Sequence, residues 1–218
     1  MLLSSNKKLF LGLALAILLA AGLLARQIKT ARSITVKTVD RPLVSPFAIE
    51  LPTTLADPLL GNPGAPLTLV VFGDLSDTGT RALLATTINF VNKHPTAVRL
   101  IFKPTFGEHL WGGALLAHKA LWCSASDRGF WPLLQILITE PNISENALAI
   151  AAKSLKLNDN QLINCTKLPA TKQAVLNAAA TTRDSGIAVS PALFVNNKQI
   201  NLEEGVEIEQ MLTAFIQP

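Results

Sequence analysis

A short apolar run that leads within a few residues into a helical pattern most constrains the fold of this chain. Residues 67–72 read Leu-Thr-Leu-Val-Val-Phe and predict a strand. Apolar residues recur at helical spacing over residues 80–94, and Pro95 ends that pattern. Residues 98–103 predict a second strand. The segment therefore predicts a strand–helix–strand unit, which places the chain in the α/β class.

Helical patterns dominate the next part of the chain, and two short strands precede a last helix. We expect helices at 110–122, 130–139, 144–155, 160–165, 170–185 and 203–216, and strands at 192–195 and 199–201. Gly186 is a suitable C-terminal cap for the helix before it, and Asn196-Asn197 predicts a turn. The predicted order is β-α-β, a helical insertion at about 107–168, and then α-β-β-α.

The turn between the first strand and the first helix holds Asp77-Thr-Gly-Thr80. A helix N-terminus offers unpaired amides and the positive end of a dipole, which stabilise a thiolate when a cysteine stands there. A carboxylate and hydroxyls cannot exchange a disulfide. Asp77 is most simply a residue that complements the dipole, with Thr78 or Thr80 capping the same turn.

Several motifs in register resemble the DsbA-like thiol-disulfide oxidoreductases over roughly residues 57–201. They are Asp57 to Pro66 with the strand after it, Asp74 and Arg81, Arg99 to Lys103, Cys123 followed by Gly129-Phe-Trp131, Cys165, and Ser190 to Asn196. The resemblance implies a thioredoxin-like fold with a helical insertion. In that family two cysteines separated by two residues begin the first helix, and those positions are Asp77 and Thr80 here. It also implies a cis Ser190–Pro191 bond beside this turn, at an edge that pairs with an extended substrate segment.

Cys123 and Cys165 are the only cysteines, and they are too far apart to form a redox motif with two residues between them. A structural disulfide, worth about 4 kcal/mol by loop-closure entropy, is the main interpretation. Buried free thiols and a reactive redox pair are the alternatives, although nothing basic adjoins either residue in sequence. A disulfide would indicate an oxidising compartment.

The N-terminal leader carries the basic charge of the chain. Residues 1–41 hold seven of the 19 basic residues and one of the 15 acidic ones, so the remainder is slightly acidic and no nucleic-acid partner is expected. Residues 9–25 have no charge and are just long enough to span a bilayer. We interpret residues 1–26 as a membrane anchor, with a cleaved signal segment and secretion as the alternative.

The placement of the domain follows from the resemblance and the cysteines rather than from the flanking charges. More basic residues follow the apolar run than precede it, which by the positive-inside rule would place the domain in the cytoplasm. The resemblance and the cysteine pattern outweigh this signal. We therefore expect a single pass through the inner membrane and a periplasmic domain at 67–218.

Residues 27–66 are rich in proline and threonine and are interpreted as a linker. Residues 33–39 alternate apolar and polar side chains, which suits an edge strand but equally an extended linker. The histidines His94, His109 and His118 predict no metal site, and no cofactor is expected. Tryptophans and one phenylalanine are expected in the core of the insertion: Trp111, Trp122, Trp131 and Phe130.

These observations favour a membrane-tethered, DsbA-like protein without catalytic thiols. It would bind extended segments of envelope polypeptides, or belong to a membrane protein complex, as a chaperone or accessory subunit. The peptide groove would be formed by Asp77, Thr78, Gly79, Thr80, Ser190 and Pro191. The contrasting hypothesis is an enzyme, a thiol-disulfide oxidoreductase that acts through Cys123 and Cys165. A purely structural role, with the groove closed, is the third.

Overall fold

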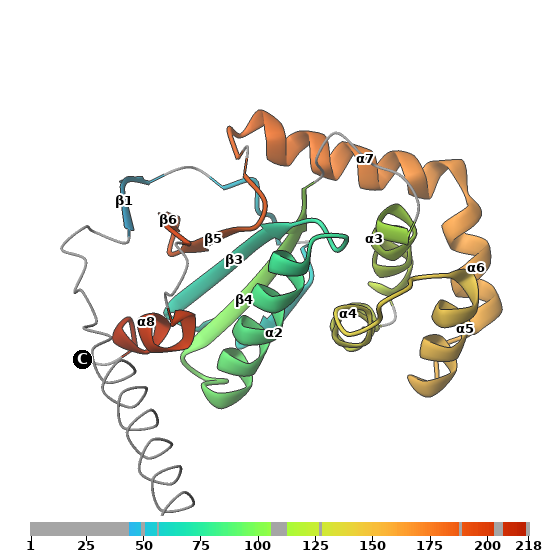
Figure 1. Cartoon of the computed structure of the whole chain (residues 1–218), viewed down its shortest axis with the longest axis horizontal. Helices are drawn as coiled ribbons and strands as arrows, with labels where there is room; N and C mark the ends of the chain where they lie inside the picture. The colour runs from blue at the N-terminus through green and yellow to red at the C-terminus, as the bar shows by residue number, and fades with distance from the viewer. Residues whose placement is uncertain are drawn as a thin grey trace, which may run out of the picture. The chain divides into compact units, whose positions relative to one another are not determined.

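A six-stranded mixed sheet runs through the described part of the chain in the order β1-β6-β5-β3-β4-β2 (Figure 1). The computed structural model describes residues 44–48, 51–55, 57–105, 113–126, 128–187, 189–202 and 207–216, all within one unit, Pro42–Pro218. The strands are β1 (Val44–Ala48), β2 (Leu59–Gly61), β3 (Leu67–Gly73), β4 (Val98–Pro104), β5 (Ala192–Val195) and β6 (Lys198–Ile200). Strands β3 and β4 are parallel, and the other pairs are antiparallel.

Helices cover the sheet and form a separate group beside it (Figure 1). They are α2 (Thr78–Lys93), α3 (Gly113–Ser124), α4 (Phe130–Leu137), α5 (Glu145–Ser154), α6 (Asp159–Lys167), α7 (Pro169–Asp184) and α8 (Ile208–Ala214). Helix α2 contacts β3, β4 and α8, whereas α3 to α6 pack on one another as the insertion. The long helix α7 contacts α3, α6 and β4, and so joins the insertion to the sheet.

The alternation of side chains along β3 divides the core between the two faces of the sheet. Leu69 and Val71 pack with α2 and with helices of the insertion in the larger cluster. Val70 and Phe72 point to the opposite face and pack in a smaller cluster that includes Phe194 and Ile187. Strand β3 is therefore buried on both faces, which explains why its sequence is almost continuously apolar.

The predicted order of elements in the domain is confirmed: β3-α2-β4, the insertion α3 to α6, then α7-β5-β6-α8. Gly186 has the positive φ, 80°, of a helix-terminating glycine. Asn196 and Asn197 both have positive φ and form the two-residue turn between β5 and β6.

The structure differs from prediction mainly before β3. Strands β1 and β2 lie within residues 27–66, which were interpreted as a linker, and they pair with β6 and β4. The last helix is shorter than predicted, since α8 spans Ile208–Ala214. The predicted anchor at 1–26, the candidate strand at 33–39, His109 and Trp111 lie outside the described residues. Among the residues that the structure does describe, no helix is long and apolar enough to cross a membrane.

Candidate functional site

Asp77 caps the N-terminus of α2 and uses both of its carboxylate oxygens to do so. Its backbone is extended, with φ −83° and ψ 127°, as expected of an N-cap. Oδ1 accepts from the amide of Gly79 at 3.1 Å, and Oδ2 accepts from the amide of Thr80 at 2.9 Å. The Thr80 hydroxyl also donates to Oδ2, at 2.8 Å. Asp77 was predicted to complement the helix dipole while Thr78 or Thr80 capped the turn, but the structure makes Asp77 itself the N-cap. The amides that would stabilise a thiolate are thus already bonded to a carboxylate.

The loop before β5 meets the start of α2 through Ser190 and Pro191. The Ser190–Pro191 peptide bond is cis, as the resemblance implied. The Ser190 hydroxyl oxygen lies 3.5 Å from the Thr80 hydroxyl oxygen and accepts from the amide of Asp74 at 3.3 Å. Because the Thr80 hydroxyl hydrogen is directed to Asp77, Ser190 is the donor in the hydroxyl pair. Hydrogen bonds therefore join the loop before β5 to the start of α2, although the two segments are far apart in sequence.

The start of α2 and the loop before β5 together form a small surface of mostly polar, uncharged groups. Thr78 and Gly79 are exposed in the first turn of α2, whereas Thr80 is fully buried. An added Cβ on Gly79 would lie 3.5 Å from the Pro191 ring, so the helix start and the proline are in near contact. Val189, the residue before Ser190 in the same loop, has an apolar side chain that is 54% exposed. We call Thr78, Gly79, Val189, Ser190 and Pro191, with the Asp77 cap, the α2 surface.

Gly73 at the end of β3 allows Thr80 to approach the strand. An added Cβ on Gly73 would lie 2.4 Å from Cγ2 and 2.5 Å from Oγ1 of Thr80. We expect Gly73→Ala to lower the free energy of unfolding by about 1–3 kcal/mol, through overpacking of a buried side chain. Urea unfolding checks this, and a double-mutant cycle with Thr80→Ala isolates the contact. An equal cost of Gly73→Ala in the wild type and in the Thr80→Ala variant would contradict this explanation.

His118 of α3 lies beneath the turn that leads into α2. Its Nε2 accepts from the amide of Leu75 at 3.4 Å, so the proton of the neutral ring is on Nδ1. Burial lowers the pKa of His118 from 6.5 to about 3. Nε2 also lies 3.9 Å from Oδ1 of Asp74, but a neutral imidazole makes no ion pair there at neutral pH. The histidine supports the turn as an uncharged acceptor.

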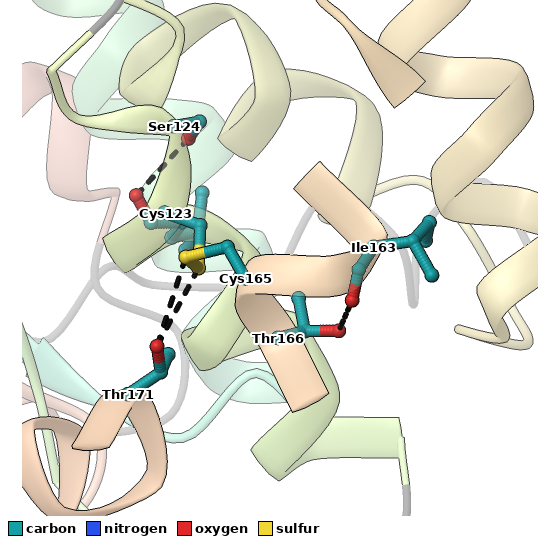
Figure 2. Close-up of a disulfide and its surroundings, with 7 residues drawn as sticks. Cys123, Ser124, Ile163, Cys165, Thr166 and Thr171 are labelled. Atoms are coloured by element: carbon teal, nitrogen blue, oxygen red, sulfur yellow. Dashed lines mark hydrogen bonds between the residues drawn. A yellow bond between two sulfur atoms is a disulfide. The ribbon is translucent and has the colours of Figure 1, made fainter. Parts of the chain in front are cut away.

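Cys123 of α3 and Cys165 of α6 form a disulfide, as the main interpretation of the sequence predicted. Both residues are half-buried. Figure 2 shows both sulfur atoms beside the hydroxyl of Thr171 in α7, whose oxygen lies 3.9 Å and 3.6 Å from the two sulfurs. The chain therefore holds an oxidised cysteine pair, but on two helices of the insertion rather than at the start of α2.

Most of the predicted groove residues come together, and other residues were missed. Asp77, Gly79, Thr80, Ser190 and Pro191 meet, while Thr78 is exposed at the same turn. Sequence reasoning did not assign the supporting contact of His118 to the turn, which no local pattern signals. Trp131 lies in the core as predicted, whereas Trp122 is 52% exposed and Phe130 is partly buried. Among the described residues, no cluster of histidine, cysteine or acidic side chains could hold a metal ion.

The fold and the strand-to-helix turn that faces a cis proline define the class of thioredoxin-fold proteins. A family model described as thioredoxin matches residues 53–216. Since this is most of the chain, the chain belongs to the thioredoxin family. No curated protein matches the chain.

Solved structures of DsbA-type proteins share the fold. BdbD from Bacillus subtilis, in its oxidised form, has a TM-score of 0.66 and 21% identity, over 78% of this chain and 98% of that one. DsbA from Chlamydia trachomatis has a TM-score of 0.60 and 19% identity, over 78% and 97%. The thiol-disulfide exchange protein alpha-DsbA2 from Wolbachia pipientis has a TM-score of 0.61 and 17% identity, over 74% and 86%. At these identities the likeness establishes a DsbA-like fold and no more.

Proposed function

We propose that this chain binds extended polypeptide segments at the α2 surface and performs no disulfide exchange there. The observation that carries the proposal is the Asp77 cap, because its carboxylate bonds the amides of Gly79 and Thr80 that would otherwise stabilise a thiolate. The same turn leaves Thr78 and Gly79 exposed, and Val189 and Ser190 are exposed in the loop before β5. The surface thus offers polar groups and one apolar side chain, which suits backbone pairing and side-chain contact with an extended segment.

We also propose that the domain is extracytoplasmic and that its partners are envelope polypeptides. A disulfide persists in an oxidising compartment, which supports a periplasmic or other extracytoplasmic domain and envelope polypeptides as partners. The uncharged run at residues 9–25 supports a tether to the inner membrane. Labelling of the domain by a membrane-impermeant reagent in spheroplasts tests this placement, because a cytoplasmic domain would stay unlabelled.

Binding is tested with a fluorescein-labelled peptide of alternating apolar and polar residues, measured by fluorescence anisotropy with the full chain. We expect Val189→Asp to weaken binding by about tenfold or more, which corresponds to roughly 1.4 kcal/mol. Ile150→Asp is the matched control, since Ile150 on α5 is 62% exposed and outside the α2 surface. No binding by the wild type, or equal loss in both variants, would contradict the proposal.

A second candidate is a thiol-disulfide oxidoreductase that acts through Cys123 and Cys165. The disulfide and the thiol-disulfide exchange function named for the Wolbachia structure support this candidate more directly than they support binding alone. The geometry of the cysteines supports it less. In the part of the chain that the structure describes, the polar neighbour of both sulfurs is the neutral hydroxyl of Thr171, which lacks the charge that lowers a thiol pKa.

An assay of dithiol oxidation and disulfide reduction with a model substrate distinguishes the two candidate functions. Turnover by the wild type that is lost in Cys123→Ser/Cys165→Ser would establish the enzyme. Absence of turnover, together with peptide binding that the double variant retains, would establish the binding protein. In the turnover assay, Val189→Asp serves as the control, because its substitution lies outside α3 and α6.

A further inference from the structure

A cavity of about 740 Å³ is lined by residues of β4, α3 and α7. Residues that precede β3 in the chain also line it: Pro52, Thr54, Asp57 and Pro58. The volume is within the range of roughly 300–1,000 Å³ that holds small-molecule ligands in proteins. Neither the α2 surface nor the disulfide lines it. The cavity is thus a separate feature, and the function proposed above does not use it.

One wall of the cavity is apolar and partly aromatic. Phe102 of β4, Leu121 and Trp122 of α3, Phe130, and Val175 of α7 provide it. Trp122 is 52% exposed, although most of its neighbours in this wall are buried. The half-exposed indole of Trp122 offers a face in the apolar cavity on which a flat or aliphatic ligand can bury its surface.

A buried ion pair forms the charged part of the cavity lining. Lys103 Nζ donates to Asp57 Oδ1 at 2.8 Å, and the two side chains are only 10% and 15% exposed. Asp57 Oδ2 accepts from the amide of Thr54 at 2.7 Å. Removing two charges from water costs several kcal/mol for each ion, so a buried pair in an apolar cavity is weak evidence for a stabilising role.

The donors of Lys103 are not all used within the described structure. An ammonium group has three N–H donors, and the bond to Asp57 uses one of them. By contrast, both oxygens of Asp57 already accept a hydrogen bond. The polar end of the cavity therefore keeps N–H donors on Lys103 that a ligand can use.

The described lining of the cavity carries no net charge. Its titratable residues are Asp57, Lys103 and His118, and the first two neutralise each other. Burial keeps His118 neutral. An anionic ligand at Lys103 would be repelled by the carboxylate of Asp57, and a cationic one by the ammonium of Lys103. A neutral oxygen acceptor meets neither penalty.

We propose that this cavity binds a neutral small molecule with an apolar, preferably aromatic, body and one carbonyl or similar oxygen acceptor. The oxygen accepts from Lys103 Nζ, and the body lies along Phe102, Leu121 and Trp122. Asp57 keeps the ammonium in place and sets the preference for an uncharged ligand.

The test uses three naphthalene probes with the same ring and different head groups. They are 2-acetonaphthone, 2-naphthoate and 2-naphthylmethylammonium, which are a neutral ketone, an anion and a cation. Equilibrium dialysis with the full chain measures binding. We expect the ketone to bind saturably and at least about tenfold more tightly than either ion, a difference of roughly 1.4 kcal/mol or more. Tighter binding of the anion or of the cation would overturn the proposal.

Variants locate the binding. Ala178→Phe fills the cavity from α7 and is expected to abolish ketone binding, whereas Ala180→Phe, on the same helix but outside the lining, retains it. Asp57→Asn/Lys103→Met removes both charges together and is expected to weaken ketone binding by about tenfold. Ketone binding that survives Ala178→Phe in folded protein would overturn the proposal. Competition by the extended peptide would also overturn it, because the cavity would then be a peptide subsite.

Discussion

Replacing Cys123 and Cys165 by serine is expected to lower the free energy of unfolding by about 4 kcal/mol. The two cysteines are 42 residues apart, so the bond closes a long loop that contains α4 and α5. Without it, the unfolded chain gains the conformational freedom of that loop, while the folded protein loses the link between α3 and α6. This is a large fraction of the stability of a typical domain, which is roughly 5–15 kcal/mol.

Urea unfolding measures the effect, with the wild type examined in oxidised and reduced form. Reduction should move the midpoint of the wild type to that of Cys123→Ser/Cys165→Ser, and it should leave the midpoint of the double variant unchanged. The dependence of the free energy on urea is also expected to be steeper without the bond, because the unfolded state exposes more surface. A midpoint of the wild type that does not respond to reduction would contradict the stabilising role.

Local patterns were sufficient to predict the central elements of the fold. Strand β3 is buried on both faces and reads as an apolar run, and α2 shows its buried face at helical spacing. The end of α7 carries Gly186, and the β5–β6 turn carries Asn196-Asn197, residues that tolerate the positive φ found there. In each case the information lies within a few residues of the structure it specifies.

Strands β1 and β2 were missed because they depend on distant partners. Strand β2 has three residues and pairs with β4, and β1 pairs with β6 with a shift in register. Strands this short have weak periodicity, and the prolines around them suggest a linker. These segments become edge strands only by pairing with β6 and β4, which lie later in the sequence.

The same distinction applies to the site. The Asp77 cap follows from a local rule, since a carboxylate before a helix bonds amides two and three residues ahead. The contacts of His118 with Leu75 and of Lys103 with Asp57 join residues 43 and 46 positions apart. No local sequence pattern predicts either contact. The resemblance located the Ser190–Pro191 loop beside α2, and composition alone would not have done so.

The stability of the protein is expected to fall steeply in mild acid because of His118. Its pKa is about 3 in the folded state and about 6.5 when the chain is unfolded. Between these values the unfolded state binds more protons than the folded state does, so the free energy of unfolding rises with pH. The contribution of His118 is fully present above pH 6.5 and is lost as pH falls toward 3. Its total is on the order of 3–5 kcal/mol, at up to about 1.4 kcal/mol per pH unit.

A substitution separates this effect from general acid sensitivity. His118→Gln keeps an acceptor for the Leu75 amide and removes the titrating group, so its stability should depend less on pH between 7 and 4. Leu121→Ala on the same helix is the control, because it destabilises a buried part of α3 without a titrating group. We expect its pH profile to run parallel to that of the wild type. Urea unfolding at one-unit intervals of pH provides the comparison.

Protonation of His118 also has a consequence for the α2 surface. The amide of Leu75 loses its acceptor when Nε2 takes a proton, and Leu75 lies two residues before the Asp77 cap. Peptide binding at the α2 surface should therefore weaken in the wild type at a pH where His118→Gln still binds. An equal loss of binding in both proteins would show that His118 only contributes to global stability. A parallel decline of stability in both would refute the role of this histidine in the acid response altogether.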